Sequence, residues 1–124
     1  MDTTRRTLLI IEDNKELQNI YSSIFNQTDW QIIGQAYDGP EAKELYRSFE
    51  EKPEVVICDI ELPSCSGLEV ASEILQFHPN QKILFVTARI LHLENQIGFK
   101  NIPRVAKPFN MDDILEELAK LILV

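Results

Sequence analysis

The stretch Val55-Val56-Ile57-Cys58-Asp59 places an aspartate directly after four apolar residues. A short apolar run rich in β-branched side chains is typical of a strand that is buried on both faces. A second run, residues 8–11, ends in Glu12-Asp13, and a third, residues 102–106, is followed by Lys107-Pro108. If these runs are neighbouring parallel strands, their carboxyl ends bring several carboxylates and one ammonium together.

Strand and helix patterns alternate along the chain. The predicted strands cover residues 7–12, 30–36, 54–59, 82–87 and 102–106. Apolar residues at helical spacing follow each strand and predict five helices, which begin near Asn14, Pro40, Leu68, Ile90 and Asn110. The helix near Ile90 is expected to be short, over residues 90–99, and its apolar pattern is mixed.

This alternation predicts an α/β fold with one parallel sheet covered by helices on both faces. Right-handed crossovers limit the topology to a doubly wound sheet. In such a sheet, ligands bind beyond the carboxyl ends of the strands. The candidate residues at or just after those ends are Glu12, Asp13, Asp59, Thr87 and Lys107.

Length and composition predict one domain over residues 1–124. The net charge of −8 argues against nucleic-acid binding by this domain, because phosphate contacts need a basic surface. Cys58 and Cys65 have no zinc-ligand spacing and form no disulfide framework, which suits a reducing cytoplasm. Neither a signal peptide nor an apolar segment of membrane-spanning length is predicted, so we expect a cytoplasmic protein with no membrane partner.

The acidic residues at the strand ends predict a Mg²⁺ site. If Asp13 and Asp59 converge, their like charges raise at least one pKa unless a cation lies between them. Mg²⁺ prefers oxygen ligands and keeps several waters. We expect Asp13 and Asp59 to supply carboxylate oxygens, Glu12 to hold a metal-bound water, and the backbone carbonyl of Glu61 to complete the protein ligands.

The same residues predict phosphoryl transfer to Asp59, since aspartyl phosphate is a known type of covalent intermediate. Such transfer needs mainly positioning and charge stabilisation from the protein. The Lys107 ammonium, the Thr87 hydroxyl and the backbone N–H groups of Ile60 and Ala88 are the predicted partners of the phosphoryl oxygens. Each residue also has a solvated or structural interpretation, which is the simpler one for Thr87 and for Lys107 taken alone, and their joint placement is what favours a site.

Several motifs together resemble the receiver domain of two-component response regulators. They are Leu9-Ile10-Ile11-Glu12-Asp13-Asn14, Ala36-Tyr37-Asp38-Gly39-Pro40-Glu41-Ala42, Asp59-Ile60-Glu61-Leu62-Pro63, Val86-Thr87-Ala88 and Lys107-Pro108-Phe109. The resemblance covers essentially the whole chain. It implies the strand order 2-1-3-4-5 and a cis peptide bond between Lys107 and Pro108.

The resemblance also implies a function. A sensor histidine kinase or histidine phosphotransfer protein is expected to phosphorylate Asp59 in the presence of Mg²⁺. A receiver catalyses only its own phosphorylation and dephosphorylation, so it is not expected to be an enzyme with another substrate. Phosphorylation is expected to draw Thr87 toward the phosphoryl group and to remodel the face formed by the fourth helix, fifth strand and fifth helix, where a second copy or an effector binds.

The sequence departs from the family pattern at Arg104, where receivers usually have Tyr or Phe. A guanidinium is not stable in the same apolar slot without a partner. The stretch between Thr87 and Lys107 is also short and contains Pro103. We therefore expect intact phosphoacceptor chemistry with an altered switch at Thr87 and Arg104. Separately, the acidic Glu61 and the basic Arg89 are expected to form an ion pair across the mouth of the site.

Three alternatives stay open. The first is a receiver-like interaction module that works without phosphorylation, which Arg104 and the short fourth crossover suggest. The second is a phosphatase of the haloacid dehalogenase type, but that family has a second Asp where this chain has Glu61, and the chain has no room for a cap domain. A flavodoxin-like protein is the third, although no Ser/Thr/Gly-rich phosphate loop follows the first strand.

Overall fold

The computed structural model describes residues 6–89, 99 and 101–123. These residues contain nine helices and strands. In chain order they are β1 Thr7–Ile11, α1 Lys15–Phe25, β2 Gln31–Ala36, α2 Gly39–Ser48, β3 Val55–Asp59, α3 Gly67–Phe77, β4 Lys82–Thr87, β5 Arg104–Ala106 and α5 Met111–Ile122. The helix predicted over residues 90–99 lies almost entirely outside the described residues.

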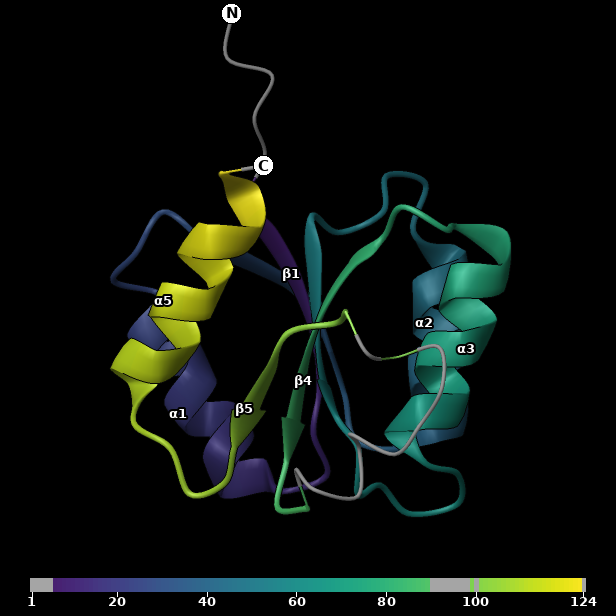
Figure 1. The fold of residues 1–124 in the computed structure, drawn as a ribbon, viewed down its shortest axis with the longest axis horizontal. Coiled ribbons are helices and arrows are strands. Elements are labelled where there is room, and N and C mark those ends of the chain that lie inside the picture. Colours follow the sequence, from purple (N-terminus) through teal and green to yellow (C-terminus); the bar gives the residue numbers. More distant parts are fainter. Residues whose placement is uncertain (1–5, 90–98, 100, 124) are drawn as a thin grey trace, which may run out of the picture.

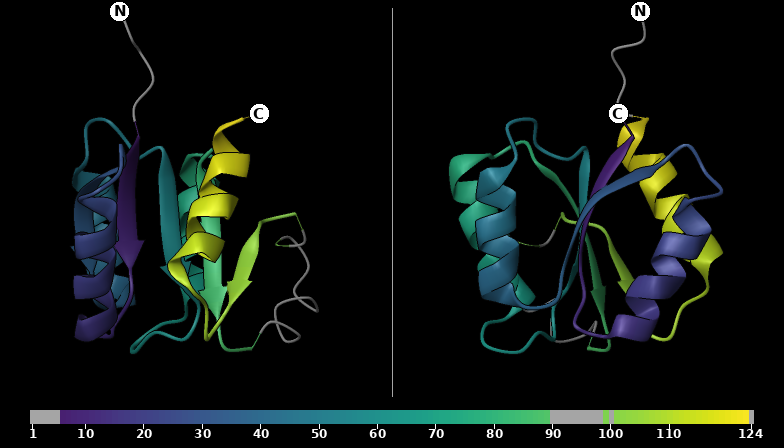
Figure 2. Two further views of the ribbon diagram at one scale, coloured as in Figure 1. Left: turned by 90° about the vertical axis from the view of Figure 1, so that its left-hand side faces the viewer. Right: turned by 180° about the vertical axis from the view of Figure 1, so that it is seen from behind.

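The five strands form one parallel sheet in the order β2-β1-β3-β4-β5. Helices α1 and α5 cover one face of this sheet, and α2 and α3 cover the other (Figures 1 and 2). The predicted α/β doubly wound fold and its strand order are confirmed. The start of β1 and the end of α5 lie at the edge of the molecule opposite the carboxyl ends of the strands (Figure 1).

Polar caps explain why the helices begin soon after the preceding strands or loops. The side chains of Asn14, Asp38, Ser66 and Asn110 each accept a hydrogen bond from a backbone N–H in the first turn of the helix that follows. Such caps satisfy N–H groups that have no partner inside the helix. These caps fix where α1, α2, α3 and α5 start, and so fix the lengths of the loops around the site.

The predicted strand ends are close to the observed ones. Residues 82–87 match β4, while β1, β2 and β3 are each one residue shorter than predicted. The fifth strand begins at Arg104 rather than residue 102. Pro103 has no N–H to donate to a ladder, and only its carbonyl takes part, accepting from the N–H of Phe85 at 3.0 Å.

The core has two layers, one on each face of the sheet. Alternate residues of β1 and β3 contribute to opposite layers, and both strands are buried along their whole length. Cys58 is buried, as expected of a small apolar residue. No helix in the described ranges is both long and apolar enough to cross a membrane.

Close packing at Gly67 brings α3 against the end of β3. A Cβ atom at this position would lie 2.1 Å from the backbone oxygen of Asp59, which is too close for any side chain. The N–H of Gly67 donates to the carbonyl of Ile60 at 2.8 Å. A glycine is therefore required here to hold the loop after Asp59 in place.

Candidate functional site

Three carboxylates meet at the carboxyl ends of β1 and β3. Glu12, Asp13 and Asp59 each offer an oxygen, and these oxygens lie within 4.8 Å of one another. They converge because β1 and β3 are paired in register, with Ile11 beside Cys58, so the next residues of the two strands, Glu12 and Asp59, lie side by side. Glu12 and Asp59 are buried, and Asp13 is exposed.

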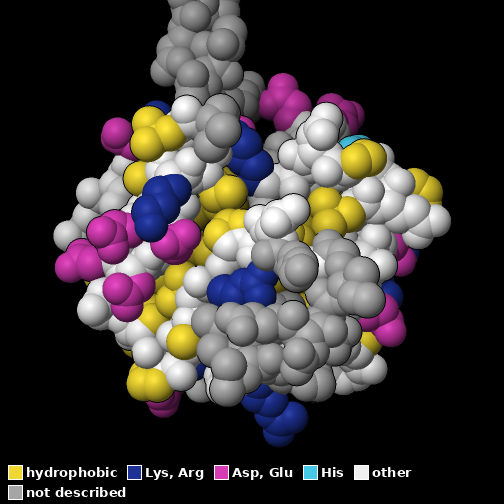
Figure 3. All heavy atoms as spheres, in the orientation of Figure 1, with side chains coloured by type: hydrophobic (Ala, Val, Ile, Leu, Met, Phe, Trp, Pro, Cys, Tyr) yellow, Lys and Arg dark blue, Asp and Glu magenta, His cyan; other side chains and the backbone are white. Residues whose placement is uncertain are grey.

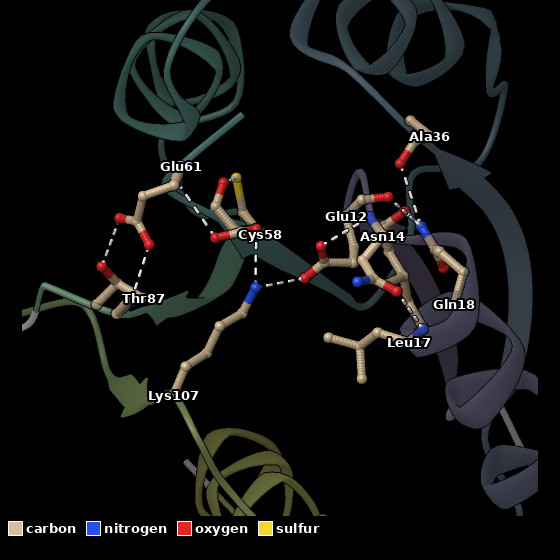
Figure 4. Close-up of polar contacts among 12 residues, drawn as sticks. Glu12, Asn14, Leu17, Gln18, Ala36, Cys58, Glu61, Thr87 and Lys107 are labelled. Carbon is tan, nitrogen blue, oxygen red and sulfur yellow. Dashed lines mark hydrogen bonds and ion pairs between the residues drawn. The ribbon is translucent and has the colours of Figure 1, made fainter. Parts of the chain in front are cut away.

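Lys107 provides the positive charge of the site (Figure 4). Its Nζ atom lies 2.9 Å from Oε1 of Glu12 and 3.0 Å from Oδ2 of Asp59. The backbone N–H of Lys107 donates to the carbonyl of Thr87 at 2.9 Å, which continues the pairing between β4 and β5. The Lys107–Pro108 peptide bond is cis, as predicted.

The surroundings of Asp59 favour its protonated form. Burial and the nearby Glu12 carboxylate raise the pKa of Asp59 to about 7, although Lys107 and the Glu61 N–H act in the opposite direction. Burial alone would lower the pKa of Lys107, but its hydrogen bonds to Glu12 and Asp59 outweigh this effect and raise that pKa. The site thus holds more negative charge than its lysine neutralises.

The donor set fits a hard divalent cation. Three carboxylates and one ammonium give a formal charge of −2, which a divalent ion would balance. All the converging ligand atoms are oxygens, the type that Mg²⁺ prefers. The exposed Asp13 leaves one side of the cluster open to solvent, where the ion's own water molecules have room.

Gln18 supports the acidic pair from α1, a role that sequence reasoning missed. Its Nε2 donates to the carbonyls of Ile10, Glu12 and Ala36 at 3.1–3.2 Å, and the residue is completely buried (Figure 4). In addition, the N–H of Asn14 donates to Oε2 of Glu12 at 3.0 Å. A polar residue beside the apolar positions of α1 was the available signal in the sequence.

On the β4 side of Asp59, the backbone donors differ from the expectation. The N–H of Ile60 donates to the carbonyl of Val86 at 3.1 Å and is therefore used by the sheet. The N–H of Glu61 instead faces the site and donates to Oδ1 of Asp59 at 3.2 Å. The ladder between β3 and β4 thus continues one residue beyond Asp59, which moves the free donor from Ile60 to Glu61.

The side chain of Glu61 reaches across to the end of β4 (Figure 4). Its carboxylate accepts from the Thr87 hydroxyl at 2.7 Å and from the Ala88 N–H at 2.8 Å. The ion pair predicted between Glu61 and Arg89 is absent from residues 6–89, 99 and 101–123. Glu61 bonds to Thr87 and Ala88 instead. The backbone N–H of Arg89 donates to Oγ1 of Thr87 at 2.9 Å.

Comparison with known proteins identifies the family. The sequence model described as "Response regulator receiver domain" matches residues 8–119. This chain belongs to the response regulator receiver family. The predicted resemblance is thereby confirmed over nearly the whole length of the chain.

Relatives of similar length support this assignment. The receiver is 29% identical to Protein CcdB of Bacillus subtilis over 118 residues, which cover 92% of this chain and 95% of that protein. It is also 29% identical to Chemotaxis protein CheY of Thermotoga maritima over 120 residues, covering 94% and 97%. The crystal structure of response regulator protein TrrA from Thermotoga maritima, in complex with Mg²⁺ and BeF, has a TM-score of 0.82 at 29% identity and covers 94% of this chain and 98% of its own.

Arg104, the departure from the receiver pattern, has partners on the main chain. It lies on β5 beside Phe85 of β4. Its guanidinium donates to the carbonyl of Phe99 at 2.8 Å and to that of Ile102 at 2.9 Å. The charged group is thus bound by the segment that precedes its own strand, which satisfies the requirement for a partner.

Proposed function

We propose that this receiver, over residues 1–124, accepts a phosphoryl group on Asp59 in a Mg²⁺-dependent step of a phosphorelay. The convergence of Glu12, Asp13 and Lys107 on the buried Asp59 carboxylate carries the proposal. The acidic neighbours of Asp59 can hold a divalent cation, and Lys107 adds a second positive charge. Both would offset the charge of a phosphoryl group on Asp59.

The roles follow from the positions of the side chains. One oxygen of Asp59 attacks the phosphorus of a phosphohistidine, the P–N bond breaks, and the imidazole leaves with its electron pair. Lys107 passes from its Asp59 contact to an oxygen of the transferred group and offsets its charge. Mg²⁺ bound by Asp13 and Asp59, with Glu12 beside it and the Glu61 carbonyl as a further ligand, would neutralise the opposite side.

We propose a sensor histidine kinase or histidine phosphotransfer protein as the donor. A groove of about 540 Å³ runs from the site between α1 and the segment after β5, and Lys107 and Ala88 are part of its lining. Its apolar lining residues are Leu17, Ile20, Pro108, Phe109 and Met111. An apolar surface that opens onto the reacting carboxylate suits a helical partner that presents a phosphohistidine.

We also propose how the phosphoryl group is removed and how its presence is passed to a partner. The receiver catalyses its own phosphorylation and dephosphorylation and acts on no other substrate. Thr87 and Arg104 then alter the face around β5 and α5, where a second copy or an effector binds. Reduced Cys58 and Cys65 agree with a cytoplasmic location.

Incubation with acetyl phosphate and Mg²⁺ tests the phosphoacceptor role. Intact-mass spectrometry should detect one added phosphoryl group on the wild type and none on Asp59→Asn, or on the wild type with a chelator. Asp29→Asn, which removes a carboxylate outside the acidic cluster, should be labelled like the wild type. A folded, Mg²⁺-binding protein that takes no label would contradict the proposal.

One observation favours the second candidate, an interaction module that needs no phosphate. The contacts of Glu61 with Thr87 and Ala88 already occupy two of the predicted phosphoryl-binding groups. If this candidate is correct, partner binding will be equally strong for the wild type and for Asp59→Asn, with or without acetyl phosphate.

A further inference from the structure

Thr87 and Ala88 have no free hydrogen for another acceptor. The Thr87 hydroxyl accepts from the Arg89 N–H at 2.9 Å and directs its single hydrogen at Oε2 of Glu61, 2.7 Å away. The Ala88 N–H directs its single hydrogen at Oε1 of the same carboxylate, 2.8 Å away. Each group is a one-hydrogen donor, so neither can bind a phosphoryl oxygen while Glu61 stays.

Glu61 is anchored beside the reacting carboxylate by its own backbone. Its N–H donates to Oδ1 of Asp59 at 3.2 Å, while its side chain extends over the gap to β4 (Figure 4). The two oxygens of a carboxylate, like two oxygens of a phosphoryl group, can accept from two neighbouring donors at once. Glu61 therefore presents to β4 the pattern of acceptors that a phosphoryl group on Asp59 would present.

We propose that the Glu61 carboxylate is an internal substitute for the phosphoryl group and competes with it for Thr87 and Ala88. The inference rests on the proposed function of Asp59 and adds a residue that controls the phosphoryl-oxygen site. In the unphosphorylated receiver, the Thr87 hydroxyl is hydrogen-bonded to the Glu61 carboxylate beside Asp59. Phosphorylation exchanges one anion for another at these two donors, and Glu61 turns out to solvent.

Two consequences distinguish this inference from a purely structural role. Removing the carboxylate should free the two donors, so that a phosphoryl analogue binds more tightly. It should also change the hydrogen bond of the Ala88 amide in the unphosphorylated protein. A residue that only stabilised the loop after Asp59 would weaken binding of the analogue when removed.

The test compares the wild type with Glu61→Ala and Glu61→Gln by amide NMR and by titration with beryllofluoride and Mg²⁺. Glu61→Ala should shift the Ala88 amide resonance in the free protein and tighten beryllofluoride binding roughly tenfold, as expected for release of charge-assisted hydrogen bonds. Glu61→Gln keeps one carbonyl acceptor, so its Ala88 amide shift and its beryllofluoride affinity should lie between those of the wild type and those of Glu61→Ala. The control Glu44→Ala removes an exposed carboxylate of α2 with the same change in net charge, and should match the wild type.

The outcomes separate the two proposals. An unchanged Ala88 resonance in Glu61→Ala, or equal or weaker beryllofluoride binding, would overturn the competition. If beryllofluoride bound none of the proteins, the proposed function would fail and the competition with it, while the Ala88 resonance would still report the contact with Glu61. If Glu61→Ala does not fold, Glu61→Gln carries both measurements.

Discussion

At the scale of single residues, Asp59 is a carboxyl group whose surroundings disfavour its charge. Burial and Glu12 raise its pKa to about 7, well above the usual value near 4. The metal binds the carboxylate form, so protonation competes with Mg²⁺ for this side chain. The affinity for Mg²⁺ should therefore rise with pH up to about pH 7 and then level off.

This competition predicts Mg²⁺ binding about ten times weaker near pH 6 than near pH 8, because the ionised fraction of a group with a pKa of about 7 changes by that factor. Isothermal titration calorimetry measures both affinities. Asp59→Asn should lose most of this pH dependence. An affinity of the wild type that stays constant between the two pH values would contradict the prediction.

At the scale of elements, α1 holds the acidic pair through Gln18. The buried amide joins the ends of β1 and β2, where Glu12 and Asp13 leave the sheet. Gln18→Leu would remove this donor from all three carbonyls, of which the Ala36 carbonyl keeps the bond from the Glu12 N–H. It should lower the free energy of unfolding by about 2 kcal/mol and weaken Mg²⁺ binding roughly tenfold, as expected for unsatisfied buried groups that also position metal ligands.

Urea denaturation and Mg²⁺ titration of the same sample measure both effects. The matched control is Gln35→Ala, which removes the neighbouring amide that donates to Oε1 of Gln18 and to Ser22 but leaves the three carbonyl contacts intact. It should lose stability with little change in Mg²⁺ affinity. If the two variants weakened Mg²⁺ binding equally, Gln18 would have no special role in the site.

Sequence patterns predict these elements well where the signal is local. Apolar runs locate the strands, and cap residues such as Asn14 and Asn110 locate the helix starts to within a residue or two. Contacts between elements are harder to predict. Ile60 and Glu61 are neighbours in the chain, and only the ladder to β4 decides which of their N–H groups faces Asp59.

The same limit applies to side chains of the site. The acidic residues and Lys107 are predictable because strand ends of a parallel sheet must meet at one edge. The reach of Glu61 to Thr87 depends on a side-chain conformation and on the distance between two strands, neither of which the sequence states. Gln18 resembles any polar residue of a helix until the packing shows that it is buried.

At the scale of the whole molecule, the buried carboxylate of Asp59 lowers the stability that the two core layers provide. Between about pH 4 and pH 7 the folded state binds a proton at Asp59 that the unfolded chain has already released. Stability in the absence of metal should therefore fall as the pH rises through this window. Lys107, whose pKa is raised, stays charged throughout the window and contributes no slope.

Chemical denaturation of the metal-free protein at several pH values tests this expectation. Asp59→Asn should flatten the profile and be more stable than the wild type near pH 8 by on the order of 2 kcal/mol, because three pKa units correspond to about 4 kcal/mol and loss of the Lys107 pair offsets part of this. A wild-type profile as flat as that of the variant would show that Asp59 ionises normally.

The outer surface of the molecule is uneven in charge. Acidic side chains gather over α5 on the face that also carries β5 (Figure 3). The sequence of α5 contains Asp112, Asp113, Glu116 and Glu117 but only one basic residue, Lys120. A partner of this face would need to be basic where it meets α5.

The hydrogen bonds of Arg104 have a consequence for how β5 can move. An aromatic ring can rotate about its own side-chain torsions while the backbone around it stays in place. The Arg104 guanidinium can leave its position only by giving up the carbonyls of Phe99 and Ile102. Arg104 therefore couples β5 to the residues that precede it. If β5 shifts while these hydrogen bonds persist, Phe99 and Ile102 shift with it.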